Sequence, residues 1–139
     1  MDSPAQPAQP AQPTPPALGI HALVWTGTWN EERARYAAER TRASGYSRLE
    51  IPLLDSWDID PAMTRRVMAA HGLAVTGNLF HTRDTDITSD DPAIVAAGER
   101  RLREGVELVH AMGGDHVCGT IYSMLGKYDR PPTPEGRAR

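Results

Sequence analysis

Four short apolar segments alternate with three segments patterned as helices, and this alternation constrains the fold more than any other feature of the sequence. The apolar segments have the length of strands and occupy residues 18–25, 48–53, 73–80 and 116–122. Strands that are apolar on both faces and separated by helices are typical of a parallel sheet covered by helices. The sequence therefore predicts an α/β fold in the order βαβαβαβ, with right-handed crossovers between parallel strands.

Local signals predict where the three helices begin and end. Thr28 and Glu31 have capping-box spacing ahead of a helix over 31–43, and Gly45 follows its end. Asp60-Pro61 and Asp91-Pro92 each combine an N-cap residue with proline at the first helical position. The third helix, which is expected to run to Met112, should bury one apolar stripe. Its members are Val95, Leu102, Val106 and Val109.

The part of the chain that is able to form a core is short. The first sixteen residues repeat Ala-Gln-Pro and contain six of the 12 prolines. Such a segment favours extended polyproline II backbone and has little to bury, so we expect residues 1–17 to be disordered. Residues 18–128 remain for the folded body. A closed eight-fold α/β barrel needs about 250 residues, so this length excludes a complete one.

The last residues contain a helix-start signal with little sequence after it. Thr133, Pro134 and Glu135 have the residue types of an N-cap, a first helical position and a first turn. We therefore expect residues 129–139 to be a loop and the truncated start of a fourth helix. The alternative interpretation is a polar, proline-rich tail without structural meaning.

Charge and cysteine content exclude several classes of function. The net charge is −3, and the basic residues form no stripe of the kind that nucleic-acid binding requires. No apolar run approaches the roughly 18 residues of a membrane span, and the N-terminus lacks the pattern of a secretory signal. A single cysteine fits a reducing compartment. The sequence predicts a cytoplasmic protein with no nucleic-acid or membrane partner.

Several motifs that suggest chemistry do not meet its requirements. No G-x-G-x-x-G follows the first strand, and Gly119 and Gly126-Lys127 are separated by six residues where a phosphate loop has four. Cys118 has no partner at a metal-binding spacing, so we interpret it as a buried structural thiol. The loop 81–89 begins with His81 and contains carboxylates, but these residue types are also common in ordinary polar loops. We therefore do not predict a metal site there.

Polar residues near the carboxyl ends of the strands are the better candidates, because parallel α/β sheets build their sites at that edge. Glu50 lies within an apolar run and must be paired, hydrogen-bonded or directed into a cavity. An ion pair with an arginine and a place in a pocket are equally compatible with its position. The other candidates in chain order are His21, Trp25, Asn78, Thr120 and Tyr122.

The sequence resembles the ketose 3-epimerases, the D-tagatose/D-psicose (allulose) 3-epimerase group of the xylose-isomerase-like sugar isomerase/epimerase barrels. The matching motifs are LGIH at 18–21, GYSRLEI at 45–51, GLAV at 72–75 and GTIYSMLGKY at 119–128, of which the last is the most specific. The resemblance implies that the folded body is the N-terminal half of a (β/α)₈ TIM barrel, with strands one to four.

The resemblance also implies where the chemistry resides. Members of this group bind one divalent metal, Mn²⁺, Mg²⁺ or Co²⁺, through two glutamates, an aspartate and a histidine, and the two glutamates move the C3 proton of a ketose through an enediolate. These four residues come from strands five to eight. The resemblance therefore assigns no catalytic and no metal-binding residue to this chain, and we expect it to bind no metal alone. It implies a sugar-binding role for His21, Glu50, Asn78, Thr120, Tyr122 and Leu125.

Two hypotheses from different classes follow. The chain is the N-terminal half of a sugar isomerase or epimerase that acts at C3 of a ketose or related sugar, and it is inactive alone. Alternatively, it is a non-catalytic half-barrel that self-associates, or completes a barrel with a partner chain, through its exposed sheet edges. An autonomous flavodoxin-like domain would need a fifth strand, which the sequence does not contain.

Overall fold

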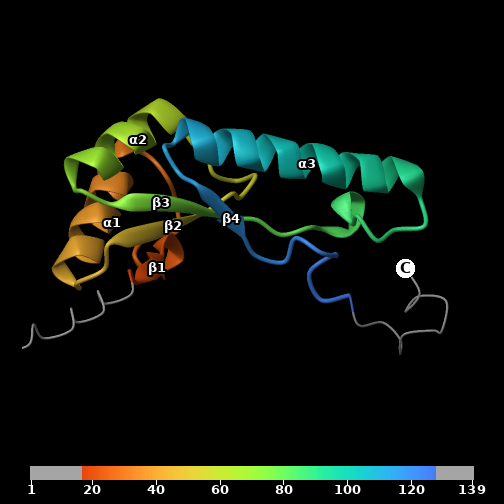
Figure 1. The fold of residues 1–139 in the computed structure, drawn as a ribbon, viewed down its shortest axis with the longest axis horizontal. Helices are drawn as coiled ribbons and strands as arrows, with labels where there is room; N and C mark the ends of the chain where they lie inside the picture. Colours follow the sequence, from red (N-terminus) through yellow and green to blue (C-terminus); the bar gives the residue numbers. More distant parts are fainter. Residues whose placement is uncertain (1–16, 128–139) are drawn as a thin grey trace, which may run out of the picture.

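The computed structural model describes residues 17–127, so the expected proline-rich tail and the expected start of a fourth helix lie outside the described residues. The strands are β1 (Gly19–His21), β2 (Arg48–Pro52), β3 (Ala74–Asn78) and β4 (His116–Cys118). They alternate with the helices α1 (Glu31–Ala43), α2 (Pro61–Ala70) and α3 (Pro92–Ala111), as Figure 1 shows. Two 3₁₀ turns, η1 (Ala22–Val24) and η2 (Arg83–Thr85), follow β1 and β3.

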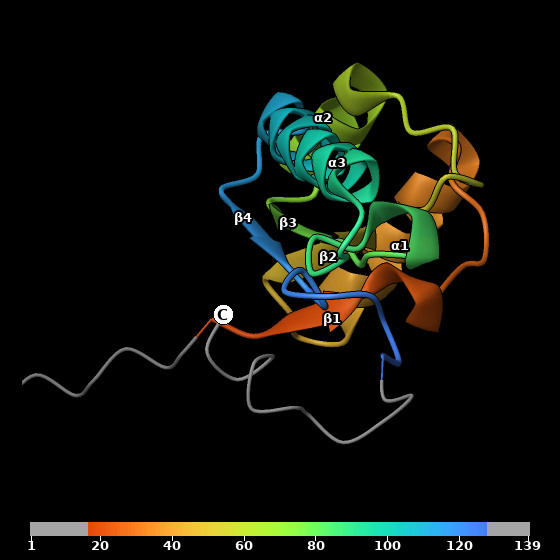
Figure 2. The same ribbon diagram turned by 90° about the vertical axis from the view of Figure 1, so that its right-hand side faces the viewer.

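The four strands form one parallel sheet in the sequential order β1-β2-β3-β4. The three helices lie on the same side of this sheet, which curves beneath them (Figure 2). Each of the first three strands is thus followed by a helix that returns the chain to the next parallel position. The predicted α/β class, strand order and strand direction are confirmed, and the arrangement is that of four consecutive strands of a (β/α)₈ barrel with the three helices between them.

The first and last strands are shorter than the sequence pattern predicts. The first apolar run leaves the sheet after His21, because the Nδ1 atom of His21 accepts a hydrogen bond from the Leu23 N–H at 3.2 Å and caps η1. The fourth ends at Cys118 instead of Tyr122, because Gly119 adopts a φ of 118°, which turns the chain out of the sheet. The segment that follows β4 is therefore a separate structural feature.

The proline-containing helix starts are confirmed, whereas the first cap is not the predicted one. The side chains of Asp60 and Asp91 cap α2 and α3. The Asp60 carboxylate accepts from the Ala62 N–H at 2.9 Å, and the Asp91 carboxylate accepts from the Ala93 N–H at 2.8 Å. The helix over 31–43 is capped by Asn30, whose Oδ1 accepts from the Arg33 N–H at 3.0 Å. The Thr28 N–H instead donates to the Thr26 hydroxyl at 3.3 Å, in the turn that precedes the helix.

The core lies between the sheet and the helices. Leu49 and Ile51 of β2 are completely buried, and the small residues of α1 allow its backbone to approach them closely. The rings of Trp29 and Trp57 stack with their centroids 5.3 Å apart, at the edge of the same core. The buried alanines of α1 are Ala34, Ala37 and Ala38.

The predicted stripe of the third helix is confirmed in part, since Val109 is buried and Leu102 packs against the core, and two glycines continue the same buried face. Gly98, Gly105 and Val109 are its buried residues, whereas Val106 is 55% exposed. At Gly98 a side chain would overlap the backbone carbonyl of Thr85, so the helix must pass directly against the turn after β3. Apolar spacing located this face but missed its two buried glycines and wrongly included Val106, because glycine carries no hydrophobic signal.

The two buried glycines of α3 provide a matched test of this close packing. Gly98→Ala forces a methyl group against the Thr85 backbone, whereas Gly105→Ala places one 2.7 Å from the movable Cδ1 atom of Leu79. Overpacking costs about 1–3 kcal/mol and the alanine returns about 1 kcal/mol of helix propensity, so we expect Gly98→Ala to lower the free energy of unfolding by up to about 2 kcal/mol. Gly105→Ala should cost less in the same denaturant titration. An equal or larger loss at Gly105 would contradict this account of the packing.

Candidate functional site

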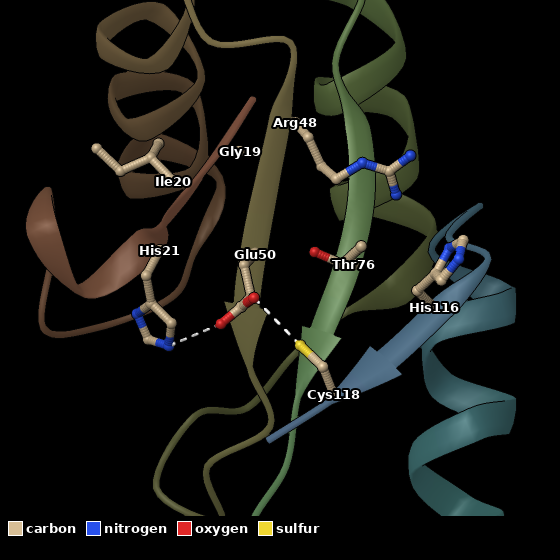
Figure 3. A pocket seen from close by; sticks show the side chains of 8 residues that line it. All are labelled: Gly19, Ile20, His21, Arg48, Glu50, Thr76, His116 and Cys118. Atoms are coloured by element: carbon tan, nitrogen blue, oxygen red, sulfur yellow. Dashed lines mark hydrogen bonds and ion pairs between the residues drawn. The ribbon is translucent and has the colours of Figure 1, made fainter. Parts of the chain in front are cut away.

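The face of the sheet that turns away from the helices is lined with polar side chains. Successive residues of a strand point to opposite faces. Leu49 and Ile51 therefore face the helices, whereas Arg48 and Glu50 face the open side. An open cavity of about 530 Å³ covers this face (Figure 3). Its lining consists of Gly19, Ile20, His21, Arg48, Glu50, Thr76, His116 and Cys118.

Glu50 is the centre of a polar cluster that draws one residue from each of the other three strands, two of them hydrogen-bonded to it. Its Oε1 accepts from the Asn78 Nδ2 at 3.0 Å and lies 3.8 Å from the His21 Nε2, and its Oε2 accepts from the Cys118 thiol at 3.2 Å. Figure 3 shows His21 and Cys118 approaching the carboxylate from the two sides. The Glu50 side chain remains 28% exposed. Of the two interpretations left open by the sequence, the structure therefore supports a place in a pocket over an arginine ion pair.

Cys118 is a correction to the sequence analysis, which interpreted it as buried. It is exposed in the described part of the chain, at the carboxyl end of β4, and its thiol also donates to the Gly77 carbonyl at 3.4 Å. The pKa of the Cys118 thiol is raised to about 11. Desolvation is the largest cause, and the hydrogen bond to Glu50 and the negative charge of Glu50 add to it. A thiol with that pKa is protonated at neutral pH, so Cys118 acts here as a hydrogen-bond donor and not as a nucleophile.

A second polar group closes the opposite end of the same face. Arg48 Nη1 donates to Asp115 Oδ1 at 2.9 Å, which links the start of β2 to the turn before β4, and His116 Nδ1 lies 2.7 Å from the same oxygen. Hydrogen bonds from His116 and then Arg48 lower the pKa of Asp115 to about 2. This group lies at the amino ends of the strands, the end at which parallel barrels place structural contacts instead of chemistry.

The six predicted sugar-binding residues do not form one group. His21, Glu50 and Asn78 converge as described. Thr120, Tyr122 and Leu125 lie on the segment that follows β4, outside the lining of the cavity. Tyr122 and Leu125 are 66% and 57% exposed. A shared role for all six in sugar binding stays a prediction.

Sequence reasoning missed four residues of this face. Arg48, Thr76, His116 and Cys118 line the cavity beside the predicted His21 and Glu50. A spacing rule could have identified them. Residues that are two positions apart on a strand share a face, so a residue two positions from a site residue points to the same side of the sheet. Arg48 precedes Glu50 and Thr76 precedes Asn78 in this way, as His116 precedes Cys118.

Within residues 17–127, no group of three or more His, Cys, Asp or Glu side chains is arranged to hold a metal ion. In the loop after β3, His81 is completely buried, and both oxygens of the Asp86 carboxylate accept hydrogen bonds from Lys127, Thr88 and Met124.

Within residues 17–127, no helix is long and apolar enough to cross a membrane.

Comparison with known proteins identifies the class of this half-barrel. No protein-family model matches the sequence. A curated L-ribulose 3-epimerase of Methylomonas sp. (strain DH-1) is 44% identical over 120 residues, which are 86% of this chain and 42% of that protein. A ketose 3-epimerase of Arthrobacter globiformis is 40% identical over 121 residues, with 87% and 42% covered. The chain thus spans less than half the length of the curated relatives it matches.

The solved structures agree with the sequence relatives. The crystal structure of D-allulose 3-epimerase from Methylomonas sp. in complex with D-allulose matches with a TM-score of 0.78 at 44% identity, over 86% of this chain and 42% of that one. A structure of L-ribulose 3-epimerase gives a TM-score of 0.78 at 28% identity, with 86% and 40% covered. The described fold therefore matches half of the TIM barrel of these epimerase structures. The chain is similar to the N-terminal half of the ketose 3-epimerases.

The lone cysteine reports on the cluster around Glu50. We expect alkylation of Cys118 by iodoacetamide to be slow at pH 8 and to rise with a midpoint at about pH 11, because its pKa is raised to about 11. Glu50→Gln removes the negative charge beside the thiol and should move this midpoint downward, though not to the value of a free thiol, because burial remains. Glu107→Gln, on the exposed surface of α3, serves as the matched control and should leave it unchanged. An unchanged midpoint in Glu50→Gln would show that the two groups do not interact.

Proposed function

We propose that this chain supplies the N-terminal half of a ketose 3-epimerase, with the polar face of its sheet forming part of the wall that receives the sugar. The observation that carries the proposal is the Glu50 cluster, which places a hydrogen-bonded carboxylate on the open face of a half-barrel that is 40–44% identical to curated epimerases. A ketose presents several adjacent hydroxyl groups. A fixed carboxylate with accessible oxygens is a suitable acceptor for them.

Each member of the cluster has a distinct role in this proposal. Glu50 accepts hydrogen bonds from sugar hydroxyls, and its side chain is held in place by the amide of Asn78 and the thiol of Cys118. His21 places a second polar group at the same edge, 3.8 Å from the carboxylate. Thr120, Tyr122 and Leu125 approach the sugar from the segment after β4.

Proton transfer at C3 is assigned to residues outside the described half. The pKa of Cys118 is raised to about 11, so this thiol is a poor base at neutral pH, and Glu50 already accepts bonds from Asn78 and Cys118. The resemblance to the ketose 3-epimerases assigns the metal ligands and the two proton-transferring glutamates to later strands. Within residues 17–127, no group of three or more His, Cys, Asp or Glu side chains is arranged to hold the divalent metal. We therefore expect residues 1–139 to have no epimerase activity alone.

A second candidate, association through the open sheet edges, is favoured by a separate observation. Within the described residues, β1 and β4 each have a strand on one side only. Exposed large apolar side chains lie on the segments that follow the two edge strands, with Leu23 and Val24 after β1 and Tyr122 and Leu125 after β4. Unpaired edges with apolar neighbours favour pairing with another chain. In this candidate, two copies close a symmetric barrel without catalysing a reaction.

A segment exchange tests the first candidate. Residues 17–127 replace the corresponding segment of the Methylomonas D-allulose 3-epimerase, and the interconversion of D-allulose and its C3 epimer is measured with Mn²⁺. We expect the chimera to be active and the unmodified chain to show no turnover. Glu50→Ala in the chimera should lower kcat/KM by roughly 10- to 100-fold, the effect of losing hydrogen bonds to a charged acceptor. Glu107→Ala is the control, since it removes an exposed carboxylate of α3.

Two outcomes would contradict the proposal. Turnover by the unmodified chain would show that a base lies within this half after all. A folded chimera without activity, confirmed as folded by its circular dichroism and melting temperature, would show that this sheet face does not serve the epimerase reaction.

Sedimentation equilibrium tests the second candidate. If the edges pair two copies, the purified chain of 15.2 kDa should sediment at twice that mass. Tyr122→Ser together with Leu125→Ser should shift the equilibrium toward the monomer, because both apolar side chains lie beside one edge. A stable monomer at high concentration would exclude this candidate.

A further inference from the structure

The segment after β4, residues 119–127, is held differently from the rest of the site. Its path begins at Gly119, with a φ of 118°, and it reaches Gly126, with a φ of 76°. Between them, Tyr122 and Leu125 are exposed and contribute little to the core. Two backbone hydrogen bonds attach it to His81, from the His81 N–H to the Thr120 carbonyl at 3.3 Å and from the Leu125 N–H to the His81 carbonyl at 2.9 Å. These two bonds do not involve Lys127, at the end of the described segment, which is held by other contacts.

Asp86 provides that attachment from the loop after β3. Its side chain is almost completely buried, and Oδ1 accepts from the Met124 N–H at 3.1 Å and from the Thr88 N–H and hydroxyl at 3.0 and 2.8 Å. Oδ2 accepts from the Lys127 Nζ at 2.6 Å. The same ammonium group donates to the Thr88 carbonyl and hydroxyl at 3.1 and 2.7 Å. One carboxylate thus joins two points of the segment to the loop.

The electrostatics agree with this geometry. Burial alone would raise the pKa of Asp86, but hydrogen bonds from Lys127, Thr88 and Met124 outweigh it and hold the pKa well below its usual range. A buried carboxylate that stays ionised with every oxygen bonded is a strong local constraint. The neighbouring His81 offers no such constraint through its ring, since neither nitrogen has a hydrogen-bond partner in the described part of the chain. Burial, followed by the charge of Arg101, lowers the pKa of His81 and favours the neutral imidazole.

We propose that Asp86 is a positioning residue, which fixes the segment 119–127 through Met124 and Lys127 and thereby sets where Thr120, Tyr122 and Leu125 stand relative to the sugar-facing sheet. Asp86 touches no reacting group in this view. Its effect on a sugar rests on the proposed epimerase function, whereas its effect on the path of the segment does not.

Hydrogen exchange of the full chain tests the attachment itself. The reporter is the Leu125 amide, whose own acceptor is the His81 carbonyl and not Asp86, so its exchange follows the position of the segment. In Asp86→Asn we expect the Leu125 amide to exchange roughly 10- to 100-fold faster, because a charge-assisted hydrogen bond is lost. The amides of Leu49 and Val75 in the sheet should keep their exchange rates. Lys127→Met should act in the same direction, and the double variant should be little worse than either single one.

Two further variants separate this role from general stability. Lys127→Arg keeps the charge and should preserve most of the protection of Leu125. Asp115→Asn removes an exposed carboxylate that pairs with Arg48 at 2.9 Å at the opposite end of the sheet, and it should leave Leu125 unchanged. If Asp86→Asn does not fold, Lys127→Met decides, because Lys127 is partly exposed and its loss leaves the core intact. An unchanged Leu125 rate in Lys127→Met, or an equal acceleration at Leu49, would overturn the proposal.

The chimera described above tests the consequence for the sugar. Asp86→Asn should raise the KM for D-allulose several-fold with little change in kcat, because it displaces binding residues and no catalytic one. A chimera that is inactive with the unmodified segment would count against the proposed function, while the exchange rates would still decide the attachment. An active chimera in which Asp86→Asn releases Leu125 and leaves KM unchanged would show that the segment does not position the sugar.

Discussion

A parallel sheet requires cover on both faces, and the helices of this chain cover only one within the described residues. Every crossover connection returns on the same side, so α1, α2 and α3 bury Leu49, Ile51 and Val75 and leave the opposite face open. That face is not apolar, as the interior of a two-layer domain would be. It carries Glu50 and its hydrogen-bonding partners, which is the residue pattern of a surface that receives polar groups. Because the helices cover only one face, the cavity lies on the other face, and that face requires something further to cover it.

The position of Glu50 shows how sheet register becomes site geometry. A carboxylate between Leu49 and Ile51 is tolerated only because its side chain emerges on the open face, where hydrogen bonds compensate for partial desolvation. Those bonds come from Asn78 on β3 and from Cys118 on β4, which are themselves register partners in the sheet. A shift of one residue in either pairing would turn these side chains toward the helices. The backbone pairing of three strands therefore fixes one functional cluster.

The fold was predictable from the sequence because its signals are local, whereas the site was only partly so. Asp-Pro pairs set the starts of α2 and α3, and the spacing of the apolar runs predicted the parallel order. Apolar spacing placed Leu102 and Val109 on the buried face of α3, but it could not predict how closely Gly98 approaches the turn that contains Thr85. Cys118 was placed in the core because an apolar run alone does not specify which residues face outward. Its orientation depends on the register with β3, which is a long-range property.

The two groups of predicted sugar-binding residues differ in what holds them. His21, Glu50 and Asn78 belong to strands, so their positions follow from sheet pairing and change only if the sheet does. Thr120, Tyr122 and Leu125 belong to a separate segment, which is held by hydrogen bonds to His81 and Asp86 and by Ile121, which packs against the core. Variation in that segment costs the core little, since Tyr122 and Leu125 contribute almost nothing to it. A scaffold with a fixed carboxylate wall and one separately attached segment can therefore change what it recognises without altering the sheet that carries it.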